Sequence, residues 1–272
     1  MTANEESGDF SLLRLVPAVL RARGFRLYTR AGQRLIDLWQ NGGSAVLGHT
    51  PPNLLRELKN TASRGLYAPF PHFLEVRFIK ALSQFFPNRS FRLYSSAPAA
   101  LEPLFESGAV ALWRPFLDPG SPFAVADNAP PVLIPVLPGI QGWRNSLPQG
   151  LCVLALASDS EQISGKLPAG DFLPPVLLAV AVRGIYELIA SPDRAKPAFP
   201  RIARALQKSR WQRQGIYLNL YEKPNTETWA ALFRCFLDAG FLIPPVPYQP
   251  LILPGVLSPG EEAKLAEILG ST

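Results

Sequence analysis

The sequence predicts an α/β protein, because patterns typical of helices and of strands alternate along its 272 residues. Leu151–Ala157 (LCVLALA) is a continuous apolar run, which is typical of a buried strand. Apolar positions recur at helical spacing around His72–Phe86. Ser258, Pro259 and Glu261 supply a capping hydroxyl, a proline at the first position and a reciprocal acid, which together predict a helix start.

The other expected elements follow from shorter patterns. Apolar positions within Ser11–Ala22 predict a short amphipathic helix. Phe25–Tyr28 and Arg34–Leu38 flank a glycine-bearing turn and predict a β-hairpin, and Thr50 is placed to cap a helix that begins with two prolines. Further expected elements are a strand at Phe91–Ser96, a helix at Ala99–Trp113, a short strand VLIPVL within the proline-dense stretch 115–148, a helix at Pro175–Ala190, a basic helix from about Ala198, a strand at Gly215–Tyr221 and a helix at Thr228–Asp238.

The composition excludes several classes of protein. No apolar run reaches the roughly 20 residues that a membrane helix needs, so no membrane partner is expected. The start, MTANEESGDF, lacks the basic region of a secretory signal. Two cysteines, Cys152 and Cys235, are too few for a disulfide framework. We therefore expect a reduced, cytoplasmic protein.

The net charge of +6 raises the question of nucleic acid, but the excess is spread over both halves of the chain. One denser basic run consists of Arg194, Lys196, Arg201, Arg204, Lys208, Arg210 and Arg213. We interpret this run as a solvated helix face. The alternative, a phosphate-binding stripe, would need aromatic or polar base readers, and only Trp211 lies among these residues. No nucleic-acid partner is expected.

The two histidines, His49 and His72, do not indicate a metal site, because neither has a cysteine or acid at ligand spacing. His49 is most simply a turn residue that bonds the backbone in the loop Gly48–Thr50. No phosphate-binding loop, dinucleotide fingerprint or nucleophile elbow occurs.

Eleven residues between positions 24 and 52 stand at a characteristic spacing. They are Gly24, Tyr28, Gly32, Ile36, Asp37, Gly42, Gly43, Leu47, Gly48, His49 and Pro52. This segment resembles the N-terminal part of class-III pyridoxal-phosphate aminotransferases, especially the glutamate-1-semialdehyde aminomutase branch. The segments GIYLNLY, ALFRCFLDAG, FLIPPVPYQP and SPGEEAKLAEIL follow the family's C-terminal order. The resemblance implies a fold-type-I aminotransferase-like protein. Residues 1–85 and 214–272 would build its small domain, and residues 86–213 a reduced large-domain remnant.

The resemblance also implies where a cofactor phosphate would bind. Ser95 and Ser96 stand where the family's loop holds that phosphate at a helix N-terminus. Ala97 and Pro98 replace the family's threonine and glutamate, so one hydroxyl contact is the most that we expect from this loop.

The two remaining cofactor positions are Asp159 and Lys166. Asp159 is the only candidate for the family's aspartate that pairs with the pyridinium nitrogen, and its alternative interpretation is an ordinary loop residue after a strand. Lys166 is the candidate for the lysine that holds the cofactor covalently. However, only about a dozen residues (160–171) stand where the family has a long lysine-bearing stretch with three glycines.

These departures favour a non-catalytic aminotransferase-like protein, a pseudoenzyme that acts as an interaction or regulatory module without a cofactor. Its partner would be a second copy or a full-length aminotransferase, because the family's active sites form across a dimer interface. The alternative is a minimal enzyme, a pyridoxal-phosphate-dependent aminotransferase or aminomutase for a small amino compound, that uses Ser95 or Ser96, Asp159 and Lys166. A decayed gene product is a third interpretation, against which the well-formed helix starts argue.

Overall fold

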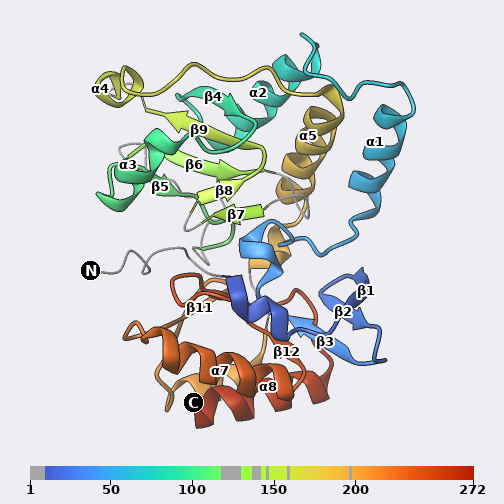
Figure 1. Cartoon of the computed structure of the whole chain (residues 1–272), viewed down its shortest axis with the longest axis vertical. Helices are drawn as coiled ribbons and strands as arrows, with labels where there is room; N and C mark the ends of the chain where they lie inside the picture. Colours follow the sequence, from blue (N-terminus) through green and yellow to red (C-terminus); the bar gives the residue numbers. More distant parts are fainter. Residues whose placement is uncertain (1–9, 118–129, 137–141, 145–146, 158–159, 196–197) are drawn as a thin grey trace. The chain divides into compact units, whose positions relative to one another are not determined.

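The computed structural model describes residues 10–117, 130–136, 142–144, 147–157, 160–195 and 198–272. The chain forms two compact units, which are described separately. Unit 1 lies within Met1–His49, Phe116–Gly120 and Asp193–Thr272, and unit 2 lies within Thr50–Pro115 and Ser121–Pro192. Figure 1 shows both units coloured along the sequence.

Unit 1 holds a four-stranded sheet that joins the two ends of the chain. Its order is β1 (Val19–Arg23), β2 (Arg26–Thr29), β3 (Arg34–Asp37) and β12 (Phe241–Leu242). Strands β2 and β3 form the predicted antiparallel hairpin, and Gly32 in its turn has a φ of 79°, which favours glycine. The short strand β12 pairs parallel with β3, so blue and red segments meet in Figure 1. Segments from both ends of the chain thus contribute to this unit.

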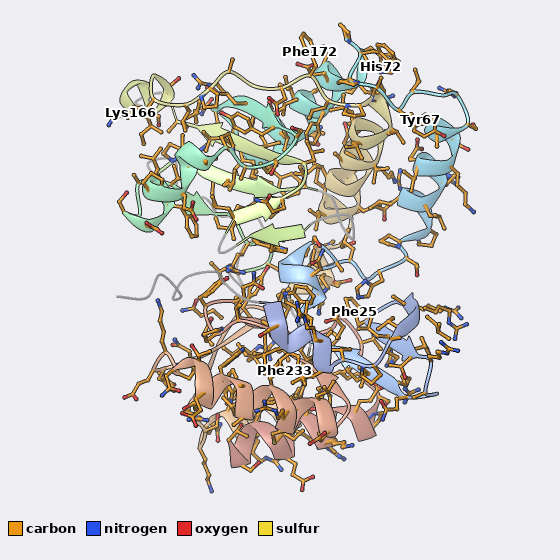
Figure 2. All side chains as sticks on the ribbon, viewed as in Figure 1. Phe25, Tyr67, His72, Lys166, Phe172 and Phe233 are labelled. Atoms are coloured by element: carbon orange, nitrogen blue, oxygen red, sulfur yellow. The ribbon has the colours of Figure 1, made fainter. Side chains whose placement is uncertain are left out.

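A second sheet and three helices complete the core of unit 1. The sheet has the order β10 (Trp211–Gln214), β11 (Tyr217–Leu220) and β13 (Leu251–Ile252). The α-helices are α6 (Pro200–Leu206), α7 (Thr226–Asp238) and α8 (Pro259–Ser271). The 3-10 helices are η1 (Phe10–Leu15), η2 (Gln40–Gly43) and η4 (Pro192–Ala195). The first residue of η4, Pro192, still belongs to unit 2. Phe233 of α7, labelled in Figure 2, is buried in the core that these elements share. Helix α8 begins with the predicted capping box of Ser258 and Glu261.

Unit 2 contains a mixed four-stranded sheet of order β4 (Ser90–Tyr94), β9 (Cys152–Leu156), β6 (Val132–Pro135) and β5 (Ala111–Leu112). Strand β9 is antiparallel to both of its neighbours, and β5 is parallel to β6. All five residues of β9 are buried, which confirms the prediction of a buried strand. A hairpin of β7 (Gly142–Arg144) and β8 (Leu147–Gln149) precedes β9.

Three long helices pack together in unit 2. They are α1 (Pro52–Ala62), α2 (Leu74–Phe85) and α5 (Pro175–Ile189), and α5 contacts both of the others (Figure 1). The short helices are η3 (Ala99–Leu101), α3 (Glu102–Glu106) and α4 (Glu161–Ser164). Residues 50–85 therefore group with the middle of the chain, although the predicted domain limits placed them with the N-terminal part; those limits stay a prediction. Over the described ranges, no helix is long and apolar enough to cross a bilayer.

Two sequence predictions at the N-terminal side are wrong. The expected helix over Ser11–Ala22 is instead η1 followed by β1, because Pro17 cannot continue a helix. Thr50 does not cap α1, because the cap position is Pro51, whose side chain makes no capping bond.

Two further helices are shorter than predicted. The expected helix over Ala99–Trp113 ends by Glu106, and Gly108 in the left-handed region then turns the chain into β5. The basic run is not one helix face. Arg194 lies in η4 and is buried, Arg201 and Arg204 lie in α6, and Arg213 lies in β10. Lys208 and Arg210 lie between α6 and β10, and Lys196 lies outside the described residues.

Candidate functional site

A later segment of the chain covers the edge of the sheet in unit 2. Strand β4 is the edge strand, and Gly170 approaches it so closely that a Cβ there would lie 3.0 Å from the Leu93 carbonyl oxygen. The backbone N–H of Asp171 donates to the same oxygen at 2.7 Å. A side chain at position 170 would thus be crowded against the backbone of β4, and this close approach brings Asp171 to the end of that strand.

Ser95 donates two hydrogen bonds to the carboxylate of Asp171. Its backbone N–H and its hydroxyl donate to Oδ2 of Asp171 at 2.8 and 2.7 Å. The hydroxyl of Ser96 lies 3.5 Å from Oε1 of Gln149, at the end of β8. Ser95 and Ser96 thus lie in one loop, but the donors that the resemblance assigns to a phosphate already bind an anion.

Two side chains of β4 anchor the segment that leads to Asp171. The guanidinium of Arg92 donates to the carbonyls of Leu167 and Pro168 at 2.9 and 3.1 Å, and also to the hydroxyl of Ser164. The buried Tyr94 donates its phenol O–H to the Pro168 carbonyl at 3.0 Å. Burial raises the pKa of Tyr94, so this donor keeps its proton at neutral pH.

Lys166 lies in this anchored segment with its side chain exposed to solvent. Its backbone N–H donates to the Ile163 carbonyl, which closes a turn after α4. Figure 2 labels Lys166 beside α4. In the part of the chain that the structure describes, no hydrogen bond or ion pair joins its ammonium to the loop of Ser95. Asp159, the third predicted cofactor residue, lies outside the described residues.

A second polar cluster lies in unit 1, within the segment that carries the family resemblance. The Asp37 carboxylate is buried, and its Oδ1 accepts from the backbone N–H groups of Trp39 and Gln40 at 2.9 and 2.8 Å. Its Oδ2 lies 2.7 Å from Nε2 of His49. The backbone N–H of His49 donates to the Gly24 carbonyl at 2.8 Å, whereas its ring is held by the Asp37 carboxylate, a contact that sequence reasoning did not predict.

Arg194 extends this cluster as a buried cation. Its guanidinium donates to the carbonyls of Val46 and Leu253 and approaches Oε1 of Gln40 at 3.4 Å. The Cζ atom of Arg194 lies 5.1 Å from the centre of the Phe25 ring. Burial lowers the pKa of Arg194 to about 10. The interpretation of the basic run as a solvated face thus fails for this residue, whose sequence neighbourhood gives no sign of burial.

Neither cluster resembles a metal centre. The described ranges contain no group of three or more histidine, cysteine or acidic side chains that could hold a metal ion. Sequence reasoning missed Asp171, which could have been found only as the single acid within residues 164–174. The site that the structure assembles at the end of β4 is thus a serine that donates two hydrogen bonds to one carboxylate.

Solved structures of aminotransferases share this fold. A glutamate-1-semialdehyde aminomutase from Pseudomonas aeruginosa PAO1 aligns with a TM-score of 0.67 and 13% identity, over 94% of this chain and 87% of that one. An acetylornithine aminotransferase from Elizabethkingia anophelis aligns with a TM-score of 0.64 and 11% identity, over 94% and 93%. The chain therefore has the α/β fold of the class-III pyridoxal-phosphate aminotransferases.

Comparison of sequences gives uncharacterised relatives over most of the chain and a named enzyme over a short stretch. An uncharacterised protein of Treponema pallidum is 27% identical over 308 aligned positions, which cover 92% of each chain. A 70-residue stretch is 34% identical to a glutamate-1-semialdehyde 2,1-aminomutase of Sorangium cellulosum, covering 26% of this chain and 16% of that enzyme. No family model matches the chain.

Proposed function

We propose that this chain is a non-catalytic aminotransferase-fold protein that acts as an interaction or regulatory module, with a second copy of itself as partner. The hydrogen bonds from Ser95 to Asp171 carry the proposal. A cofactor phosphate at this loop would meet the Asp171 carboxylate instead of free donors, and the like charges would repel each other.

The position of Lys166 supports the same proposal. A lysine that holds a cofactor covalently works when it is desolvated, because burial lowers its pKa and frees its amine. Lys166 is exposed and lies in a turn anchored by Arg92. A cytoplasmic location fits the free cysteines Cys152 and Cys235 and is part of the proposal.

The alternative function, a minimal pyridoxal-phosphate enzyme, is favoured by the shared fold, since one of the similar solved structures is a transaminase with the cofactor bound.

Covalent labelling distinguishes the two functions. The protein is incubated with pyridoxal phosphate and reduced with borohydride, and the pyridoxyl lysines are mapped by mass spectrometry. We expect only the low background labelling that exposed lysines such as Lys59 and Lys80 also receive. Stoichiometric labelling at Lys166 that disappears in Lys166→Arg would contradict the proposal.

Exposed aromatic side chains of unit 2 support a protein partner. Tyr67, Phe70 and Phe73 are each more than half exposed, as is Phe172. Phe73 precedes α2, and Glu75 lies in the first turn of this helix. Phe172 lines a hollow together with Glu75, so Phe172 also lies near the start of α2. Figure 2 labels Tyr67 and Phe172 at the outer side of this unit. Large apolar side chains left exposed in this number support a protein-interaction site as part of the proposal.

Light scattering after gel filtration tests the partner. We expect a dimer at micromolar concentration and a shift to monomer in the double variant Phe73→Ser, Phe172→Ser. The matched control is Leu20→Ser on β1, which removes an equally exposed apolar side chain from unit 1. A wild-type monomer would overturn the homodimer and would leave a full-length aminotransferase as the partner to test.

A further inference from the structure

The strands that begin unit 1 are rich in arginine. Residues 10–36 contain six arginines and neither a lysine nor an acidic residue. Strands β1, β2 and β3 of this stretch lie side by side, and β1 is at the edge of the sheet (Figure 1). Positive charge is therefore concentrated on one small sheet, although the chain as a whole carries its excess thinly.

The strand register gathers four of these arginines on one face of the sheet. Residues that pair across antiparallel strands place their side chains on the same face. Arg21 pairs with Tyr28, and Tyr28 pairs with Arg34, which gives one row across the three strands. Arg23 pairs with Arg26 in the next row of this face. We call Arg21, Arg23, Arg26 and Arg34 the arginine face.

The opposite face of the sheet belongs to the core of unit 1. Leu27 and Leu35 pair with each other on that face, and both are buried. Arg21 and Arg23 of β1 are exposed. The arginine face is therefore open to solvent at the edge strand.

One carboxylate of the chain already binds to the arginine face. The side chain of Glu261 accepts from Nε and Nη2 of Arg26 at 3.0 and 2.6 Å, and its Oε1 lies 3.4 Å from Nη2 of Arg34. This two-point contact is the geometry in which the planar arginine fork binds a carboxylate. Glu261 thus shows which chemical group the face accommodates.

The two arginines of the edge strand have no such acid. Among the residues that the structure describes, no carboxylate pairs with Arg21 or Arg23. The Cζ atom of Arg21 lies 4.4 Å from the centre of the Tyr28 ring. The guanidinium therefore covers one side of the aromatic ring of this face, which counts against a stacking platform for nucleobases.

We propose that the arginine face binds an extended acidic segment of a partner protein, with two of its carboxylates on Arg21 and Arg23. The two arginines are two positions apart on β1, so their Cα atoms are about 6 to 7 Å apart. Alternate side chains of an extended segment have the same spacing and point to one side. The face shares no residue with the Ser95 loop, so this inference stands or falls independently of the proposed function.

Fluorescence anisotropy on the full chain tests the charge preference with three labelled probes. They are a short peptide in which glutamate alternates with serine, the same peptide with glutamine in place of glutamate, and an oligothymidylate of the same net charge as the glutamate peptide. We expect the glutamate peptide to bind about tenfold more tightly than the glutamine peptide, and more tightly than the oligothymidylate. Its affinity should fall as salt is added, because exposed ion pairs are screened. Equal affinity of the two peptides, or tighter binding of the oligothymidylate, would overturn the inference.

A double variant locates the binding site. Arg21→Gln with Arg23→Gln should weaken the glutamate peptide about tenfold and leave the weak binding of the glutamine peptide unchanged, because only carboxylates pair with the guanidiniums. The matched control is Arg56→Gln with Arg64→Gln, which removes two exposed arginines from unit 2 and should change neither affinity.

The single variant Arg23→Gln guards against loss of the contact between Arg21 and Tyr28. It leaves that contact in place and should still weaken the glutamate peptide about threefold. An unchanged affinity in Arg23→Gln, or an equal loss in the control variant of unit 2, refutes the site.

Discussion

Ser95 and Asp171 are joined by two hydrogen bonds to a single carboxylate oxygen, at 2.8 Å from the backbone N–H and 2.7 Å from the hydroxyl. Seventy-six positions separate the two residues in sequence. The pair fastens the segment before α5 to the end of β4, next to the close approach of Gly170 to Leu93. A carboxylate of the chain thereby occupies the donors at a strand end, which is where α/β proteins commonly bind ligands.

Replacing Asp171 with alanine should lower the free energy of unfolding by about 1 kcal/mol. Both bonds are charge-assisted, but they lie at the surface, where water can replace them. Urea unfolding of wild type, Asp171→Ala, Ser95→Ala and the double variant measures the coupling. The double variant should be clearly less destabilised than the sum of the single ones, and strict additivity would show that the pair contributes nothing.

Replacing Gly215 with alanine should unfold the protein or cost more than about 3 kcal/mol. Gly215 forms the turn between β10 and β11 with a φ of 60°, and a Cβ there would lie 1.9 Å from the Phe116 carbonyl oxygen. Gly32→Ala is the matched control, since its φ of 79° is equally left-handed but no atom lies within 4 Å of an added Cβ. That variant should lose only about 1 kcal/mol, so the difference between the two melting temperatures isolates the clash.

Arg194→Met should destabilise unit 1 by about 3 kcal/mol, although methionine keeps most of the apolar stem. The variant would leave the Val46 and Leu253 carbonyls without their guanidinium donor in a buried site. Arg204→Met on the exposed face of α6 is the control, and its effect should stay within about 0.5 kcal/mol. A similar small loss in Arg194→Met would mean that the buried cation is not required for stability.

Local signals account for the part of the fold that sequence could predict. Strand β9, helix α5 and the start of α8 follow from an apolar run, a helical apolar pattern and a capping box, each within a few residues. Thr50 does not cap α1, because the helix begins at Pro52, one residue later than expected. Pro51 therefore holds the cap position instead of Thr50. The first residue of a helix depends on the backbone conformation before and after it, and a short sequence pattern does not determine that conformation.

The candidate site depends on contacts between distant segments, so little of it could be predicted. The family resemblance drew attention to the loop of Ser95, but its acceptor Asp171 becomes a neighbour only when the segment with Gly170 docks on the edge of β4. The burial of Arg194 likewise depends on carbonyls from positions 46 and 253, at both ends of the chain. In sequence it is one of seven basic residues, and nothing distinguishes it from the exposed ones.

Glu261 should stabilise the protein in a pH-dependent way. Its carboxylate, 11% exposed, accepts from Nε and Nη2 of Arg26 at 3.0 and 2.6 Å and from the Ser258 backbone N–H at 2.8 Å. Burial raises the pKa of this carboxyl, but the bonds from Arg26 and Ser258 together outweigh burial and lower the pKa below its ordinary value of 4.5. Glu261→Gln keeps the shape and removes the charge, and it should cost about 1 to 2 kcal/mol at pH 7.

The sign of the pH dependence follows from the lowered pKa. Between pH 7 and about 5, Glu261 is ionised in the folded and the unfolded chain, so the gap between wild type and Glu261→Gln stays constant. As the pH falls from 4.5 through the lower pKa of the folded state, the folded carboxylate takes up a proton and its contribution is lost. Urea unfolding at pH 7 and pH 3 should therefore show a clearly smaller gap at pH 3. A gap of equal size at both values would mean that the folded and unfolded chains bind the Glu261 proton equally, which would contradict the lowered pKa of this carboxyl.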